Sequence, residues 1–225
     1  YSINADLKSP FGGNDSSHAF FPLTWPEHMV WTKLLAKSIL DYSVIKPKIF
    51  VENYIPFKSL NYKKINFRKK SIALFDVEPQ RMSIYIKENG FGVEAEYKNY
   101  NKNFEQTFFL DILDLAYKYG FTVYHKRKRT LDDEKKRTYL NLINKLESKT
   151  YFYSIDPNYD VKMLINDTTA TISEVFTSVS YVAKLMGKNS IYYDPFNYIY
   201  KNDEHRNGVT VVSGKSELEQ WFKSI

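Results

Sequence analysis

From residue 71 onward, short apolar runs alternate with longer segments of helical periodicity, and this alternation limits the possible folds more than any other feature of the chain. Apolar runs bounded by turn residues are typical of buried strands, and they lie at 71–75, 121–124, 151–155, 170–173, 190–193 and 208–212. Apolar residues at three-and-four spacing predict helices between them, at 104–119, 131–146, 160–166, 177–186 and 216–222. Repeated units of this kind imply the α/β class, with a parallel, doubly wound sheet, right-handed crossovers and helices on both faces. A ligand site is then expected beyond the carboxyl ends of the strands.

The first third of the chain differs in composition from the rest. Residues 1–68 hold five of the eight prolines, and the basic run 62–70 follows at their end. A helical pattern at 30–42 and a strand candidate at 48–52 lie within this part. We therefore expect two units, one with its linker at 1–68 and a second domain at 69–225. Because the first residue is not methionine, we also expect the chain to be a piece of a longer protein.

Composition limits the chemistry and the partners. The chain has 225 residues, of which 43% are hydrophobic and none is cysteine. It can bury a substantial core, whereas disulfides, thiolate catalysis and cysteine-ligated zinc are excluded. A net charge of +6 suggests acidic partners, such as nucleic acid, anionic lipid or phosphorylated small molecules. No apolar run approaches the roughly 20 residues that span a bilayer and no signal peptide is recognisable, so we expect a cytoplasmic protein that is at most peripheral to a membrane.

Several common ligand sites have no motif in this sequence. It contains no G-x-G-x-x-G, no phosphate loop of the Walker type and no G-x-S-x-G, so dinucleotide, P-loop and serine-hydrolase sites lose their main support. The four histidines are scattered, and none belongs to an H-E-x-x-H pattern. We therefore predict no bound metal and no cofactor.

The stretch 173–195 carries the clearest candidate for a ligand site. A hydroxyl-bearing turn precedes a short amphipathic helix, a glycine, a buried strand and an acidic strand end. In a parallel α/β sheet this order places Thr177 and Ser178 at the positive end of a helix dipole, where free N–H groups and hydroxyls can hold a phosphate. Serine and threonine are also the ordinary N-cap residues. A nucleotide-sugar phosphate site and a simple helix cap are both open interpretations.

Other unusual polar residues follow the remaining strands on the same rim of the sheet. They are Asp76, Glu78 and Arg81 after the first strand, His125 with 126–129 after the second, 156–158 after the third, Glu174 after the fourth and Asp194 after the fifth. A basic cluster opposite a hydroxyl-capped helix start predicts a phosphate or pyrophosphate site. The alternatives are that 126–129 is a solvated loop and that Asp76 and Asp194 cap turns. Strand alternation sends one of Tyr192 and Tyr193 inward and the other outward.

Four segments together resemble a known family. Residues 175–178, 187–195, 126–129 and 75–79 read V-F-T-S, G-K-N-S-I-Y-Y-D-P, K-R-K-R and F-D-V-E-P. They resemble the S-x-P-F-T-S, G-K-P-S-I-Y-Y-D-P, K-P-K-R and F-D-V-x-P elements of the bacterial polysaccharide-biosynthesis proteins that carry a "PFTS" motif. Val175 and Asn189 stand where that family has proline. The resemblance covers about residues 70–195.

The resemblance implies a glycosyltransferase. The family is similar to the C-terminal, Rossmann-like donor-binding domain of GT-B glycosyltransferases. This similarity implies metal-independent transfer of a sugar from a nucleotide-sugar donor to a glycan acceptor, in bacterial capsule or lipopolysaccharide biosynthesis. On this analogy the donor phosphates contact His125, Lys126, Lys128, Arg129, Thr177 and Ser178. The nucleotide or its sugar contacts Glu78, Arg81, Glu174 and Asp194.

The same resemblance makes residues 1–68 a remnant of the acceptor-side domain. Glu27, His28 and Glu52 are then candidates for the catalytic base that activates the acceptor hydroxyl. Two other classes of function stay open, namely a non-catalytic nucleotide-binding module of the same fold and a basic nucleic-acid-binding protein whose aromatic side chains stack on bases. Because the aromatic residues mostly fall at core spacings, we expect no nucleic-acid partner. The sequence leaves the donor, the acceptor and the oligomeric state open.

Overall fold

The computed structural model describes residues 25–52, 65–77, 103–127, 137–175 and 177–225. These residues form a mixed α/β structure with a two-stranded sheet and a six-stranded sheet. All strand pairs in both sheets are parallel.

Every strand predicted from residue 71 onward is present in the large sheet. The strands are β3 (Ser71–Phe75), β4 (Thr122–Lys126), β5 (Phe152–Ile155), β6 (Ala170–Glu174), β7 (Asn189–Asp194) and β8 (Thr210–Ser213). Their order across the sheet is β5-β4-β3-β6-β7-β8. The chain therefore starts in the middle, moves outward to β5, crosses back and moves outward again to β8. This is the order of a Rossmann-like, doubly wound sheet, and the predicted fold class is confirmed.

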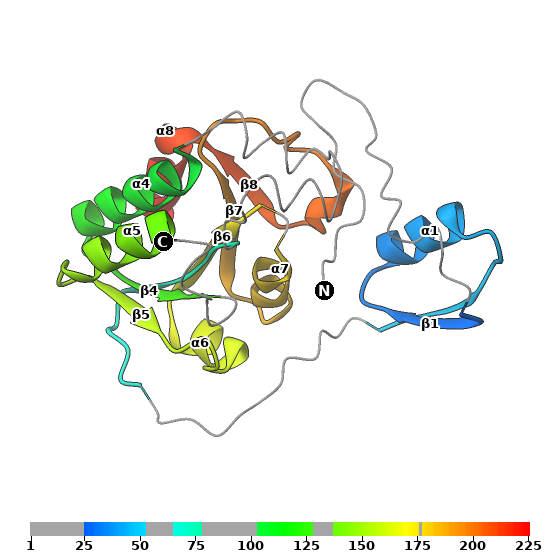
Figure 1. Cartoon of the computed structure of the whole chain (residues 1–225). Helices are drawn as coiled ribbons and strands as arrows, with labels where there is room; N and C mark the ends of the chain where they lie inside the picture. Colours follow the sequence, from blue (N-terminus) through cyan, green and yellow to red (C-terminus); the bar gives the residue numbers. More distant parts are fainter. Residues whose placement is uncertain (1–24, 53–64, 78–102, 128–136, 176) are drawn as a thin grey trace.

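Helices cover both faces of this sheet. They are α4 (Phe104–Tyr119), α5 (Arg137–Glu147), α6 (Val161–Asp167), α7 (Ser178–Leu185) and α8 (Gly214–Ser224), with a short 3-10 helix η3 (Glu204–Arg206) before β8. In Figure 1, α4, α5 and α8 lie on one face, and α6 and α7 lie on the other. The predicted helices are confirmed, although α8 begins at Gly214, before the expected residue 216. The predicted start of α5, at 131–136, lies outside the described residues.

Helix α4 illustrates how the sequence fixes the ends and the buried side of an element. Phe108, Phe109 and Ile112 lie on one side of the helix and are fully buried. Gly120 ends the helix with a φ of 73°, and its N–H is accepted by the carbonyl of Ala116. Glycine adopts this left-handed conformation without steric cost, which explains why the helix stops there.

The two adjacent tyrosines of β7 correct one expectation. Both Tyr192 and Tyr193 are fully buried, although alternation was expected to turn one of them outward. The Tyr192 hydroxyl donates to the carbonyl oxygen of Thr177 at 2.9 Å on the α7 side, and the Tyr193 hydroxyl donates to Asp111 of α4 at 2.8 Å. Because helices cover both faces of a parallel sheet, the two alternating directions of a central strand both lead into a core.

The first described segment is a small strand–helix–strand unit. It consists of β1 (Glu27–Val30), α1 (Lys33–Tyr42) and β2 (Lys48–Val51), and β1 pairs with β2. Thr32 caps α1, since its hydroxyl oxygen accepts the N–H of Leu35 at 3.1 Å. The helix and the second strand were predicted, whereas β1 was not, because its four residues show no clear apolar pattern. The expected boundary between residues 68 and 69 stays a prediction.

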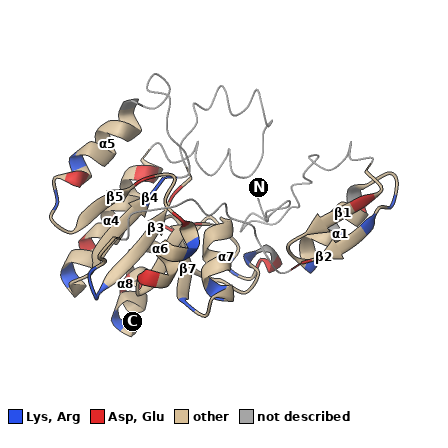
Figure 2. Ribbon diagram, turned by 90° about the horizontal axis from the view of Figure 1, so that it is seen from below, with Lys and Arg blue, Asp and Glu red and all other residues tan. Residues whose placement is uncertain are grey.

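Charged side chains avoid the interior of the large sheet. In Figure 2 the strands are almost entirely tan, and the coloured Lys, Arg, Asp and Glu residues lie on helices, on connections and at strand ends. The exceptions at strand ends are therefore the residues from which a site can be built.

Candidate functional site

The candidate site lies at the carboxyl ends of β3 and β6. These two strands are neighbours in the middle of the sheet, and the chain leaves them toward opposite sides, β3 toward β4 and β6 toward β7. Such a switch in strand order leaves a crevice at the carboxyl edge, which is where doubly wound sheets bind their ligands. The residues that follow β3, β4, β5 and β6 meet at this edge.

A buried polar cluster lies on one side of the switch point. The Nε2 atom of His125 is 3.0 Å from Asp76 Oδ1, and the Tyr139 hydroxyl donates to the other carboxylate oxygen of Asp76. Because a carboxylate only accepts hydrogen bonds, Nε2 of His125 is the donor. The His125 ring is fully buried, between Phe109 at 5.0 Å and Phe152 at 5.7 Å between ring centroids. Its Nδ1 has no hydrogen-bond partner in the described part of the chain.

This cluster ties three elements together. Asp76 follows β3, His125 belongs to β4 and Tyr139 belongs to α5. The side chain of Asp76 therefore contacts two neighbouring elements, and the turn cap considered from the sequence stays untested. Contact of His125 with a donor phosphate stays a prediction, and its ring lies inside the sheet layer.

Glu174 joins the two sides of the switch point directly. Its Oε1 accepts the backbone N–H of Val77 at 2.9 Å, so a carboxylate at the end of β6 holds the chain as it leaves β3. Only 4% of Glu174 is exposed. Contact of Glu174 with a nucleotide or a sugar is not tested, and the structure assigns it this bridging bond.

Among the described helices that have an N-cap residue, α7 alone has neither a bond from the N-cap side chain nor an acidic residue in its first turn. Thr177 is the N-cap by backbone position, but its side chain accepts no bond from the helix. Its hydroxyl donates inward, with Ser173 Oγ at 2.7 Å and the carbonyl oxygen of Glu174 at 3.1 Å as acceptors. Ser173 is also 2.6 Å from Ser180 Oγ, and Ser180 donates to the carbonyl oxygen of Ile191 at 3.0 Å. The hydroxyl of Thr177 thus begins a buried chain of hydrogen bonds that leads into the protein.

Because the Thr177 hydroxyl turns inward, it does not cap the first turn of α7. A helix start has N–H groups that its own backbone cannot satisfy, and α1 and α6 use side chains of Thr32 and Asp160 for this purpose. At α7 no side chain of the N-cap takes this role. Ser178 is half-buried at the first helical position, and its hydroxyl has no hydrogen-bond partner among the described residues. Thr177 is thus the N-cap of α7 by position, as one interpretation of the sequence had it, although its side chain does not cap the helix; a phosphate contact at this helix start stays a prediction.

Lys126 ends β4 and points toward the β5–α6 connection. Its ammonium donates to the carbonyl oxygen of Pro157 at 2.7 Å. Burial lowers the pKa of Lys126, and the carboxylates of Asp156 and Asp160 partly offset this effect. In this arrangement Lys126 joins two strand ends, and its contact with a donor phosphate stays a prediction.

Asp194 orders the loop after β7. It is fully buried, and its two carboxylate oxygens accept the N–H groups of Phe196 at 3.1 Å and Ile199 at 2.8 Å. This is the turn-capping interpretation that the sequence left open. A role of Asp194 in binding a nucleotide or a sugar is untested.

The remaining candidates divide into two groups. Glu78, Arg81, Lys128 and Arg129 lie outside the described residues. The candidate bases belong to the small unit, where Glu27 is 3.8 Å from Lys48 and His28 stacks on Trp25 at 5.9 Å. The backbone N–H of Glu52, which follows β2, donates to the carbonyl of Val30. None of these contacts tests a catalytic role.

Sequence reasoning missed the buried partners of the candidate residues, namely Tyr139 beside Asp76 and the two serines beside Thr177. Tyr139 was counted only as part of a helical pattern, and Ser173 and Ser180 were not singled out. A weak signal for the serines exists, since Ser173 interrupts a buried strand and Ser180 interrupts the apolar side of a helix. Polar residues at such positions need a partner inside the protein.

No three His, Asp or Glu side chains gather at metal-binding distance in the described part of the chain. None of the helices within the described ranges is long and apolar enough to cross a membrane.

Comparison with known proteins gives a family. A model of the family described as "Polysaccharide biosynthesis PFTS motif protein" matches residues 1–222. No curated protein matches at a significant level. Among solved structures, the chain is similar to the pneumococcal O-GlcNAc transferase GtfA in complex with UDP and GlcNAc, at 13% identity and a TM-score of 0.45. This alignment covers 98% of the present chain and 41% of GtfA, so the chain spans less than half the length of that protein.

Proposed function

The chain belongs to the polysaccharide biosynthesis PFTS motif family, and we propose that its six-stranded sheet binds the nucleotide-sugar donor of a glycosyltransferase. The match extends beyond the expected range of about 70–195 to both sides. The first 69 residues therefore belong to the family pattern as well. The proposed reaction transfers a sugar to a glycan acceptor in the synthesis of a bacterial surface polysaccharide such as capsule or lipopolysaccharide, on the cytoplasmic side.

One observation supports this proposal above the others. The start of α7 lies at the carboxyl edge beside the switch point, and the hydroxyl of its N-cap donates to Ser173 and does not accept a bond from the first turn. A helix start of this kind favours an anion through its dipole and through its free N–H groups. The diphosphate of a nucleotide sugar is such an anion. Asp160 supplies a carboxylate to α6, whereas α7 has no acidic residue in its first turn.

The geometry divides the roles of the two hydroxyl residues. Both possible acceptors of the Thr177 hydroxyl lie inside the protein, so its oxygen can only accept a further bond. A phosphate oxygen needs a donor, and we assign this contact to the Ser178 hydroxyl and to the N–H groups of the first turn. Thr177 then positions the turn, and the buried chain through Ser173 holds it in place.

The chemistry follows from charge. Transfer breaks the bond between the anomeric carbon and a phosphate oxygen, and the departing phosphate gains negative charge. Donors fixed beforehand at this position stabilise the transition state more than the ground state. In the proposed mechanism α7 and Ser178 supply this stabilisation without a metal. A carboxylate or a histidine such as Glu27, His28 or Glu52 would remove the proton of the acceptor hydroxyl.

Nucleotide binding by the purified chain tests the proposal. Thermal unfolding would be followed with CMP, CDP, UDP, GDP and a short oligonucleotide, because a ligand of the native state raises its apparent stability. We expect at least one nucleoside diphosphate to stabilise the chain and Ser178→Ala to weaken that effect. Ser216→Ala, at an exposed serine of α8, is the matched control.

Two results would overturn the proposal. One is stabilisation by oligonucleotide alone with a steep dependence on salt, which indicates nucleic-acid binding. The other is nucleotide binding that Ser178→Ala leaves unchanged, which would place the ligand elsewhere. Sugar transfer by the full-length protein would then separate an enzyme from a non-catalytic module.

A further inference from the structure

The amino ends of β3, β4 and β5 carry a surface that the proposed donor site does not use. We name it the basic tyrosine strip, and it consists of Arg68, Lys70, Tyr117, Lys149, Tyr151 and Tyr153. The segment 65–70, cyan in Figure 1, passes β5 before it enters β3. The strip therefore borders the edge strand β5, at the end of the strands opposite to the candidate site.

The first half of the strip is built on Tyr153. The guanidinium carbon of Arg68 lies 5.8 Å from the centre of the Tyr153 ring, and its Nη2 donates to the Tyr153 hydroxyl at 3.2 Å. The other stacking partner is Tyr124 at 5.5 Å. Tyr153 keeps 39% of its surface exposed, so the pair is fixed in place and still reaches solvent.

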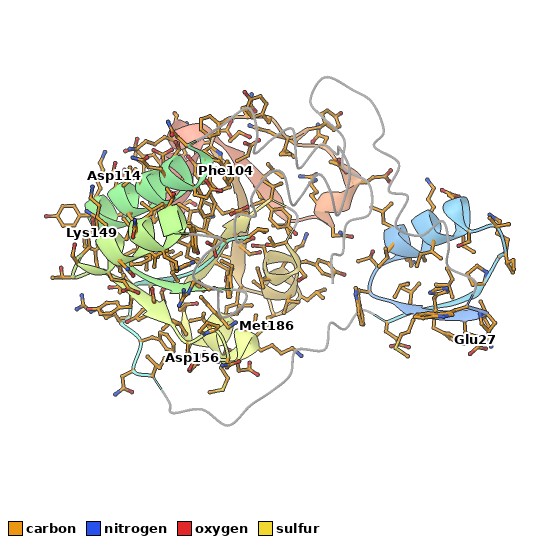
Figure 3. The ribbon with its side chains drawn as sticks, viewed as in Figure 1. Glu27, Phe104, Asp114, Lys149, Asp156 and Met186 are labelled. Atoms are coloured by element: carbon orange, nitrogen blue, oxygen red, sulfur yellow. The ribbon has the colours of Figure 1, made fainter. Side chains whose placement is uncertain are left out.

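The second half repeats this arrangement on Tyr151. Lys149 Nζ lies 5.7 Å from the Tyr151 ring centre, and Tyr117 of α4 packs against the same ring at 5.2 Å. Tyr117 is 71% exposed, which is unusual for a large aromatic side chain that has a neighbouring ring to cover it. Figure 3 labels Lys149 on this outer side of the sheet. Tyr151 directly precedes β5 and Tyr153 lies within it, so the two halves are neighbours along the chain.

The cations of the strip have no carboxylate partner within the part of the chain that the structure describes. Lys70 contacts the Phe121 ring at 5.3 Å, and none of Arg68, Lys70 and Lys149 forms an ion pair with a described residue. On the neighbouring α4–α8 surface the lysines are paired instead, Lys118 with Glu219 at 2.6 Å and Lys215 with Asp114 at 2.9 Å. The strip thus concentrates positive charge that no described residue neutralises through an ion pair.

We propose that the basic tyrosine strip binds an anionic glycan, a sugar polymer that carries carboxylate or phosphate groups. The electron-rich face of an aromatic ring attracts the C–H bonds of a sugar ring, and Arg and Lys bind carboxylates and phosphates. A strip of alternating rings and cations matches a polymer that alternates apolar sugar faces with anionic groups. The family of this chain makes polysaccharides, and the strip would hold the polymer away from the donor.

The composition of the strip argues against a membrane surface. The exposed large hydrophobic residues of the strip are Tyr117 and Tyr153, and neither is aliphatic. Peripheral membrane binding buries Leu, Phe or Trp among the lipid chains. The positive charge of the strip can attract either an anionic glycan or an anionic lipid surface, so the experiment must include both.

Binding of three polymers and one vesicle would test the proposal with the full chain. The probes are dextran sulfate, hyaluronate, neutral dextran and vesicles of phosphatidylcholine with phosphatidylserine. We expect the two anionic glycans to bind, with neutral dextran at least roughly tenfold weaker and no binding to vesicles. Arg68→Gln or Lys149→Gln should each reduce the salt dependence by about one released ion. Tyr117→Ala should weaken binding about tenfold at an unchanged salt dependence.

A control of equal charge separates the strip from the overall charge of the protein. Lys33→Gln with Lys37→Gln removes two exposed lysines of α1 and should leave glycan binding unchanged. Equal weakening by this pair and by Arg68→Gln with Lys149→Gln would overturn the proposal, as would tight vesicle binding or an inert Tyr117→Ala. Because these probes contain no nucleotide, the result stands whether or not the donor site binds one.

Discussion

Helices α6 and α7 start at the same edge of the same sheet, but their first turns are completed in different ways. At α6 the Asp160 carboxylate accepts the N–H of Met163 at 2.8 Å, and Lys126 balances this charge from β4. At α7 the N-cap Thr177 turns its hydroxyl inward, and the first turn has no acidic residue. Since every helix start attracts negative charge, α6 supplies its own anion, and in our proposal a ligand supplies the anion at α7.

The largest expected effect comes from placing a carboxylate at the start of α7, as Asp160 does at the start of α6. Ser178→Asp places a carboxylate in the first turn, where the helix dipole stabilises it by about 0.3–1 kcal/mol. Two like charges about 4 Å apart repel by about 4 kcal/mol at an effective dielectric constant near 20. We therefore expect nucleoside diphosphate affinity to fall up to roughly 1,000-fold while the melting temperature stays equal or rises. Calorimetric titration and thermal unfolding measure the two effects.

Ser178→Asn is the neutral control for this change. Asparagine is similar in size to aspartate, carries no charge and has an N–H donor. We therefore expect a much smaller loss of nucleotide affinity than in Ser178→Asp. If the aspartate variant binds as tightly as the asparagine variant, the phosphate does not lie at α7 and the contrast with α6 has no functional meaning.

Removing the carboxylate that caps α6 should have the opposite pattern of effects, a loss of stability without a loss of nucleotide affinity. Asp160→Ala deletes a side-chain cap, which costs about 1 kcal/mol of unfolding free energy, and should leave nucleotide affinity unchanged. Asp160→Asn retains an acceptor and should recover most of the stability. Denaturant unfolding of the three proteins, with nucleotide titration of each, checks this expectation, and a large loss of affinity in Asp160→Ala would contradict the division between the two starts.

The sequence was sufficient for the elements of the large sheet because local signals agreed there. Apolar runs such as 170–173 and 190–193 became β6 and β7, and Gly120 ended α4 as expected. β1 was not predicted, because an edge strand of four residues with one buried side chain carries little periodicity. Burial of both Tyr192 and Tyr193 was also missed, since it depends on helices from distant parts of the chain.

The site was predictable in place but not in its contacts. Strand ends located Asp76, His125, Glu174 and Thr177 at one edge, because topology alone brings those ends together. The sequence could not show which way each side chain points. The pairing of Asp76 with His125 joins residues 49 positions apart, and the Glu174 bond to Val77 spans 97 positions.

A smaller effect tests the inward hydroxyl chain. Thr177→Val keeps the shape and the extended backbone of the N-cap but removes the bond to Ser173. We expect a loss of roughly 0.5 kcal/mol, at the low end for a hydrogen bond, because Ser173 keeps Ser180 as a partner. Nucleotide affinity should fall less than in Ser178→Ala. Denaturant unfolding measures the stability of both variants, and nucleotide titration shows which variant loses more affinity. A larger loss in Thr177→Val than in Ser178→Ala would make Thr177 the phosphate contact.

The smallest expected effect concerns how the unfolding free energy depends on pH near the start of α6, where Lys126 interacts with Asp160. Burial lowers the pKa of Lys126 in the folded protein. The unfolded chain therefore binds more protons between that lowered value and the ordinary value of about 10.4. In this window Lys126 makes the unfolding free energy rise as the pH rises. The buried Tyr192 and Tyr193 have raised pKa values, so they make stability fall above about pH 10.

Comparison of Lys126→Met with the natural chain isolates the contribution of the lysine. Both proteins share the tyrosines, so the difference in their unfolding free energies should grow in favour of the natural chain as the pH rises from about 8 to about 10. Asp160→Asn should steepen this rise, because the Asp160 carboxylate raises the pKa of Lys126 and opposes the effect of burial. Parallel pH curves for all three proteins would mean that Lys126 and Asp160 do not share one charge site, and α6 would then lose the internal balance that sets it apart from α7.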